Sequence, residues 1–141
     1  MNNRVNKGSE RDELSEETIN KALKEGILED AYKEISEIRE KMSREDVKQT
    51  QARKILEEAR KVKDKTDKKK LKNSIIRILL LLEYQYKRGV IKENMKKNYE
   101  LILKSALKLV DESNPEELGK NLYDLIEMLT IKFYEREKSG R

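Results

Sequence analysis

The densest cluster of positive side chains in the sequence lies between Arg60 and Lys72. Eight lysines and arginines stand there against two aspartates. Cations of this kind bind nucleic acids mainly through backbone phosphates, which gives affinity without sequence readout. The cluster is therefore a candidate phosphate-binding ridge, and the alternative is a loop whose charges are only solvated. Its candidate contacts are Lys61, Lys68, Lys69, Lys70 and Lys72.

Two smaller basic groups extend this candidate site along the chain. Arg53 and Lys54, together with Lys48, would form a basic face on the helix that precedes the cluster. Lys87 and Arg88 follow the most apolar stretch of the sequence. Both groups also have an ordinary structural explanation. Lys54 can pair with a glutamate one turn away, and cations in the last turn of a helix favour its dipole.

Other kinds of chemistry have little support in the sequence. The chain contains no cysteine and no histidine, which removes thiolate nucleophiles, Cys/His zinc sites and imidazole catalysis. The acidic pairs Glu57–Glu58 and Glu116–Glu117 fall on exposed faces or at a helix start. There is no glycine-rich phosphate loop and no metal-ligand spacing. We therefore expect a protein that is not an enzyme and has no cofactor and no metal.

The tyrosines leave two interpretations open. Their rings could stack on nucleic-acid bases. At helical spacing, tyrosines are more often residues at the edge of the core with a solvated hydroxyl. The residues concerned are Tyr32, Tyr84, Tyr86, Tyr99, Tyr123 and Tyr134.

The charge is unevenly distributed along the 141 residues. Residues 1–45 have a net charge of −3, residues 46–110 have +11 and residues 111–141 have −3. The basic middle predicts a strong local potential and a polyanionic partner. The N-terminal residues lack the apolar region of a secretion signal, so we expect a cytoplasmic protein.

Composition and periodicity predict an all-α fold. The chain has one proline and five glycines, and apolar residues recur at helical spacing. We predict a single-domain bundle of about five helices over residues 15–141, preceded by a flexible tail at 1–14. Helix starts are predicted at Ser15, at Ser43, at Thr66 or Asp67, and at Asn114 before Pro115. Helix ends are predicted at Gly26 and Gly89.

The stretch from Leu71 to Gly89 is predicted to be the central helix of that bundle. Its apolar run from Ile75 to Leu82 is interrupted only by Arg77. The run would cover roughly 12 Å as a helix, while a bilayer needs about 20 apolar residues, so we predict a buried core helix and not a membrane span. The helix is apolar over much of its circumference. Such a helix needs covering on several sides, either inside the bundle or by a second chain in a homodimer.

Three segments resemble the small, all-helical subunit of the type III-A CRISPR effector, the Csm complex. Residues 50–55 (TQARKI) resemble that family's T-x-Q-[IL]-R-K-[IFL] helix, with Ala52 in place of a larger aliphatic residue. Residues 81–89 (LLEYQYKRG) are similar to its K-L-A-Y-x-A-G-R motif, although here the arginine precedes the glycine. The final helix, with Lys132-Phe133-Tyr134, resembles the family's aromatic-rich last helix.

The resemblance covers residues 27–136 and implies a non-catalytic subunit of a ribonucleoprotein. Several copies would support the duplex of guide RNA and target RNA without reading its sequence. They would also contact other subunits of the effector, whose backbone subunits would cleave the RNA. Arg53 and Lys54 match the family's basic pair, and Lys87 or Arg88 would take the place of its terminal arginine.

Three other interpretations stay open at this stage. The first is a helical protein-interaction module or oligomerising scaffold without nucleic-acid binding, which would use the apolar face of residues 71–86. The second is an enzyme with a carboxylate metal site. The third is a DNA-reading helix-turn-helix, for which no clear recognition helix is visible.

Overall fold

The computed structural model of the protein describes residues 12–43 and 49–139, except for the side chains of residues 43, 49 and 131–139. Within those ranges the fold is all-α, as predicted, with six α-helices where about five were expected. The helices are α2 (Glu16–Glu25), α3 (Glu29–Ser43), α4 (Gln49–Arg60), α5 (Lys68–Lys87), α6 (Glu93–Leu109) and α7 (Pro115–Ser139). A short 3₁₀ turn, η1 (Val110–Glu112), joins α6 to α7.

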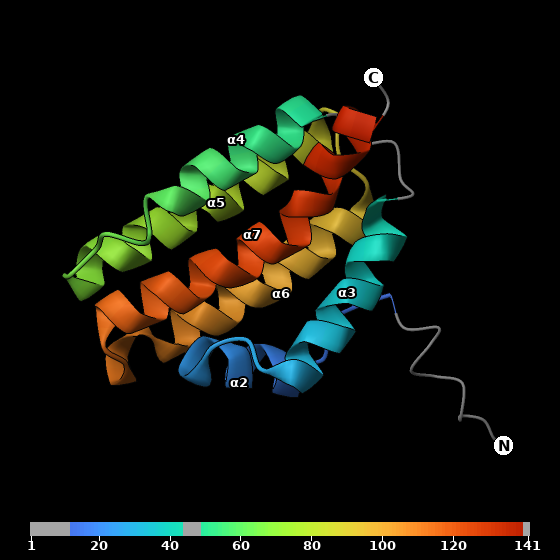
Figure 1. Ribbon diagram of the computed structural model, residues 1–141. Helices are drawn as coiled ribbons and strands as arrows, with labels where there is room; N and C mark the ends of the chain where they lie inside the picture. The colour runs from blue at the N-terminus through green and yellow to red at the C-terminus, as the bar shows by residue number, and fades with distance from the viewer. Residues whose placement is uncertain (1–11, 44–48, 140–141) are drawn as a thin grey trace, which may run out of the picture.

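The helices form a four-helix bundle with a second, shorter layer (Figure 1). Helices α4, α5, α6 and α7 run alternately in opposite directions, and each packs against its neighbours. This is the up-and-down arrangement that short connections favour. Helices α2 and α3 form the second layer, on the side of the bundle away from α4 and α5. Both pack against α7, and α2 also packs against α6.

The middle of the molecule is occupied by α7, not by the predicted central helix. Helix α7 packs against α2, α3, α4, α6 and, more weakly, α5. Helix α5 lies at the outside of the bundle and buries only one stripe, which includes Leu71, Ile75, Ile78 and Leu82. The prediction of a central position was wrong because apolar composition does not show which residues a neighbour covers. No helix in the described ranges is long and apolar enough to cross a membrane.

Three of the predicted helix caps are confirmed, whereas the cap predicted at Ser43 is wrong, because Ser43 is the last residue of α3 and α4 begins at Gln49. The Ser15 hydroxyl accepts a hydrogen bond from the Thr18 amide, and Asn114 accepts one from the Glu117 amide. Asp67, one of the two predicted alternatives, accepts from the amides of Lys69 and Lys70 at 2.7 and 3.3 Å. Such side-chain acceptors replace the partners that the first amides of a helix lack.

The two predicted helix ends are also confirmed. Gly26 and Gly89 follow the ends of α2 and α5 with φ angles of 91° and 78°, respectively. Positive φ costs glycine little, because glycine has no Cβ.

The folded domain begins earlier than Ser15. Residues 1–11 lie outside the described residues, but residues 12–14 of the predicted flexible tail are anchored to α6. Leu14 is only 3% exposed, and its amide donates to Asn98 Oδ1 at 2.8 Å. The Asn98 side chain donates in turn to the Asp12 carbonyl at 2.9 Å. One buried amide side chain therefore satisfies two backbone groups of a segment without secondary structure.

Candidate nucleic-acid interface

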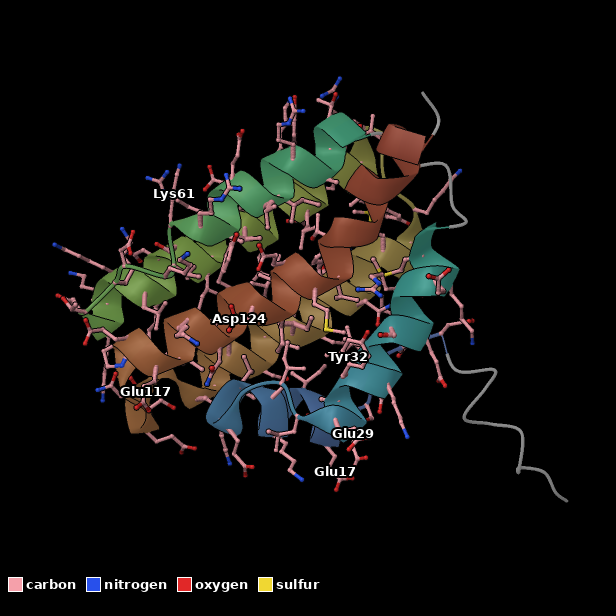
Figure 2. All side chains as sticks on the ribbon, viewed as in Figure 1. Glu17, Glu29, Tyr32, Lys61, Glu117 and Asp124 are labelled. Atoms are coloured by element: carbon pink, nitrogen blue, oxygen red, sulfur yellow. The ribbon has the colours of Figure 1, made fainter. Side chains whose placement is uncertain are left out.

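The basic residues gather on the hairpin formed by α4 and α5. Residues 49–88 contain 13 lysines and arginines and 5 acids, a net charge of +8. Residues 12–43, which form the α2–α3 layer, contain 5 and 10, a net charge of −5. Figure 2 shows Lys61 on the hairpin side, with Glu17, Glu29 and Tyr32 on the opposite side of the molecule. The sequence asymmetry is thus a spatial asymmetry as well.

Helix α4 is seated on the bundle by small and branched side chains. Ala52, Ile55, Ala59 and Val62 are fully buried. The small residues permit a close approach to α7, where Gly119 lies under the Val62 carbonyl. A Cβ atom on Gly119 would lie 2.3 Å from that oxygen. Because this face is buried, Arg53 and Lys54 of the predicted site project from the exposed face of α4.

The first turn of α5 holds the most concentrated part of the site. Lys68, Lys69 and Lys70 are its first three residues and are all exposed. The N-terminus of a helix carries a partial positive charge, so cations there oppose the dipole. Among the described residues, the turn contains no acid to offset them, and Asp67 just before it provides the cap. The result is a strongly positive helix end.

Two of the four predicted lysines here are engaged within the fold. Lys68 Nζ donates to the Asp111 carbonyl at 2.6 Å, and Lys72 Nζ pairs with Asp111 Oδ1 at 2.9 Å. Both contacts fasten α5 to η1. The ammonium groups of Lys69 and Lys70 make no ion pair with any described residue. Those two lysines are the ones best placed to bind an external anion.

The connection between α4 and α5 is held by further contacts of its cations. Lys61 Nζ lies 3.0 Å from Glu58 Oε2. Lys63 Nζ lies 4.6 Å from the centre of the Tyr123 ring, a cation–π contact with α7. Lys61 stays exposed. This predicted site residue therefore keeps contact with solvent although it has a partner.

Two further predicted residues, Lys87 and Arg88, lie at the end of the hairpin away from its connecting turn. Lys87 and Arg88 are exposed at the end of α5, and the Arg88 guanidinium lies 5.5 Å from the Tyr84 ring centre. Seventeen residues of helix separate Lys70 from Lys87, which is roughly 26 Å. Lys48 lies outside the described residues. The predicted residues therefore do not form one compact site but are spread along the hairpin.

One residue of this surface was not predicted. Arg77 is exposed on α5, between the two ends of the hairpin. It follows Lys70 by seven residues, or two turns, and so lies on the same side of the helix. The seven-residue spacing could have predicted that Arg77 belongs to the basic surface. It was missed because Arg77 stands inside an apolar run that was interpreted as core.

The tyrosines fall into two groups. Tyr99 and Tyr123 are buried, and the Tyr99 hydroxyl lies 2.6 Å from Thr130 Oγ1. Tyr32, Tyr84 and Tyr86 are among the exposed large apolar side chains. The side chain of Tyr134 is not described. Of the five tyrosines whose side chains the structure describes, the three exposed ones could meet a base.

The described residues contain no cluster of three or more His, Cys, Asp or Glu side chains that could hold a metal ion. Comparisons with protein-family models, curated proteins and solved structures found no match. The resemblance to the CRISPR small subunit stays a prediction.

Proposed function

We propose that the protein is a non-catalytic, RNA-binding small subunit of a type III-A CRISPR effector. The cations of the α4–α5 hairpin would contact the backbone of the guide–target duplex in the cytoplasm, without reading its sequence. The observation that carries the proposal is the first turn of α5, where three consecutive exposed lysines stand at the positive end of a helix. The resemblance in residues 50–55 and 81–89 supports the same function.

The arrangement of these lysines is hard to explain by stability alone. A cation at a helix N-terminus destabilises the fold by about 0.3–1 kcal/mol. Asp111 offsets this for Lys68 and Lys72, and the capping Asp67 offsets part of it at the backbone, but the ammonium groups of Lys69 and Lys70 make no ion pair with a described acid. A phosphate would bind here through the ammonium groups of Lys69 and Lys70, because the backbone amides of these two residues already donate to Asp67.

The length of the basic surface favours an extended polyanion over a small phosphate ligand. Cations occur at both ends of α5 and along α4, over roughly 30 Å of helix. Duplex RNA is recognised mostly by its shape and by contacts to phosphates and 2′-hydroxyls. Contacts spread in this way would hold a duplex without reading its bases.

The test compares a double substitution, Lys69→Gln with Lys70→Gln, with a matched control, Lys21→Gln with Lys24→Gln. Both control lysines are exposed on α2, in the acidic layer. Binding to two duplex RNAs of unrelated sequence would be measured across a salt series. We expect the hairpin variant to bind both RNAs more weakly. The negative slope of log K against log salt should become less steep by up to about 2, since each lost phosphate contact contributes about 0.9.

Two outcomes would contradict the proposal. The first is that the hairpin variant and the control bind RNA as tightly as the unsubstituted protein does. The second is that both variants lose the same affinity, which would show that net charge matters and not the hairpin.

A second candidate function is a helical protein-interaction module that binds no nucleic acid. The exposed apolar residues Ile76, Leu80 and Tyr84 on α5 favour it, because a phosphate-binding helix has no need of aliphatic side chains on its outer face. The absence of RNA binding at low salt would leave this candidate in place of the first.

A further inference from the structure

The outer face of α5 carries a row of apolar side chains that the fold leaves uncovered. Ile76, Leu80 and Tyr84 are 44%, 59% and 58% exposed, respectively. They are spaced four residues apart and therefore form one stripe along the helix, which we call the outer stripe. Isolated exposed apolar residues are common, but a contiguous row of large ones marks an interaction surface.

The outer stripe is separate from the stripe that holds α5 in the bundle. Leu71, Ile75, Ile78 and Leu82 are fully buried against α4 and α6. The residues of the outer stripe fall on the opposite side of the helical turn, so they contribute little to that packing. A helix that is apolar on two opposite faces has room for a second partner.

The charged residues beside the outer stripe are mostly positive. One side of α5 faces η1 and α6, as the contacts Lys72–Asp111 and Tyr86–Lys96 show, respectively. Helical spacing places Lys70, Arg77 and Arg88 on the other side, and Lys69 and Lys87 at the two ends of the stripe. Glu83 is the only exposed acid of α5. These five cations and one acid give the rim a net charge of +4.

We propose that the outer stripe docks an amphipathic helix of a partner protein, with apolar side chains facing Ile76, Leu80 and Tyr84 and acidic residues along its edges. Helices bind helical surfaces through apolar side chains spaced three and four residues apart. The charge of the rim selects the edges of the partner helix, because opposite charges guide association and like charges oppose it. The cations of the rim are also those assigned to RNA, so the acidic helix and RNA would compete for α5. Ile76 and Leu80 take no part in RNA binding, and substitutions there separate the two ligands.

Two other occupants fit the surface less well. A second copy docked symmetrically through α5 would place a rim of +4 against an identical rim. RNA would leave the aliphatic side chains unused, because bases stack on aromatic rings or arginine planes.

The experiment uses the full chain and three labelled synthetic peptides of about 20 residues, long enough for several helical turns. The first is an amphipathic helix with leucines on one face and glutamates along both edges. The second has lysines in place of the glutamates, and the third is a scramble of the first. Fluorescence anisotropy would measure binding. We expect the acidic helix to bind about tenfold or more tightly than either of the others, and to be weakened by salt.

Substitutions assign that binding to the outer stripe. Leu80→Glu should reduce binding of the acidic helix about tenfold or more, since it introduces a charge at the centre of the stripe. The matched control is Tyr32→Glu, at an exposed tyrosine of α3 on the acidic layer, and it should have no effect. Arg77→Glu leaves the stripe intact and should weaken the acidic helix while strengthening the lysine helix. That reversal would test the proposal even if Leu80→Glu perturbed folding.

Four results would overturn the proposal. Equal binding of the acidic and lysine helices would remove the role of the rim, and insensitivity to Leu80→Glu would remove the role of the stripe. Sedimentation that shows a dimer dissociated by Leu80→Glu would assign the face to a second copy of the chain. Loss of RNA affinity in a neutral Leu80→Ser variant equal to that of the Lys69 and Lys70 variant would assign the face to RNA.

Discussion

The α2–α3 layer and the α4–α5 hairpin use polar side chains in opposite ways. In the layer, charged and amide groups complete the fold. The Glu34 carboxylate of α3 accepts from the Ser15 amide at 2.6 Å and from the Thr18 hydroxyl at 2.7 Å, and so caps a different helix. In the hairpin, lysines such as Lys69 and Lys70 stand exposed at a helix end that their charge destabilises.

The same contrast extends to the attachments of each region. Asn121 of α7 donates to the Leu23 carbonyl at 2.8 Å, and Arg39 of α3 donates to the Met128 carbonyl at 3.2 Å. Both bonds attach the acidic layer to α7 by specific polar contacts. The hairpin is seated mainly by close apolar packing, with Gly119 under the Val62 carbonyl. The polar side chains of the acidic layer thus serve stability, and the exposed cations of the hairpin are available for binding. Substitutions can test the two roles separately.

The largest effect on stability should come from Gly119→Ala, which disrupts the close packing between α7 and the α4–α5 hairpin. In an exposed helix this change stabilises by about 1 kcal/mol. Here the added Cβ would lie 2.3 Å from the Val62 carbonyl oxygen, so α4 and α7 must move apart. We expect a loss of about 3 kcal/mol in the free energy of unfolding, measured by urea denaturation.

The control for this prediction is Lys120→Ala, at the next and exposed position of α7, which should change stability by less than about 0.5 kcal/mol. A Gly119→Ala protein as stable as the unsubstituted one would show that the two helices do not approach as closely as the structure indicates.

The next effect tests the anchoring of the acidic layer. Asn98→Ala removes the partners of the Leu14 amide and the Asp12 carbonyl, and it leaves a buried donor unpaired. We expect a loss of about 2 kcal/mol and faster hydrogen exchange at the Leu14 amide. Asn73→Ala, on the exposed face of α5, is the control and should leave both quantities unchanged. Slow exchange retained in Asn98→Ala would contradict the anchoring.

The sequence predicted what depends on neighbours in the chain. Ser15, Asp67 and Asn114 cap amides two or three residues away, so their pattern is legible without a fold. The all-helical class followed from periodicity in the same way. The position of α5 could not be predicted, because apolar residues on two faces of a helix fit a central helix and an outer helix equally well.

The other features that the sequence did not predict depend on contacts between residues that are far apart in the chain. Asn98 and Leu14 are 84 residues apart, and Lys68 and Asp111 are 43 apart. No local pattern distinguishes an asparagine or lysine that has such a partner from one that is merely solvated. The basic cluster was therefore predictable as a charge, but the division between engaged Lys68 and Lys72 and unpaired Lys69 and Lys70 was not.

A smaller effect with an unusual sign should follow from Lys69→Glu with Lys70→Glu. Glutamates near the N-terminus of α5 favour the helix dipole, and each replaced lysine also removes an unfavourable charge. We expect the free energy of unfolding to rise by about 1 kcal/mol in total while RNA binding is lost. The control is Lys104→Glu, at an exposed position in the middle of α6, which should be nearly neutral for stability. A fall in melting temperature for the hairpin variant would show that these lysines serve the fold after all.

The smallest effect is on the pH dependence of stability. It concerns the ion pair between Glu13, in the segment that precedes α2, and Lys97 of α6. Lys97 Nζ lies 3.0 Å from Glu13 Oε2, and the hydrogen bond and the charge of Glu13 raise the pKa of Lys97 above its ordinary value of 10.5. A lysine whose pKa is raised by folding contributes stability below the unfolded value and loses it as the pH rises through the folded value. Glu13→Gln should therefore be slightly less stable than the unsubstituted protein at neutral pH, and the difference should vanish above the folded pKa of Lys97.

The difference will be small, because the side chains of Glu13 and Lys97 are both exposed to solvent. Glu37→Gln, at an exposed position of α3, is the control. A stability difference that stays constant through the alkaline range would show that Glu13 acts by packing and not by its charge on Lys97.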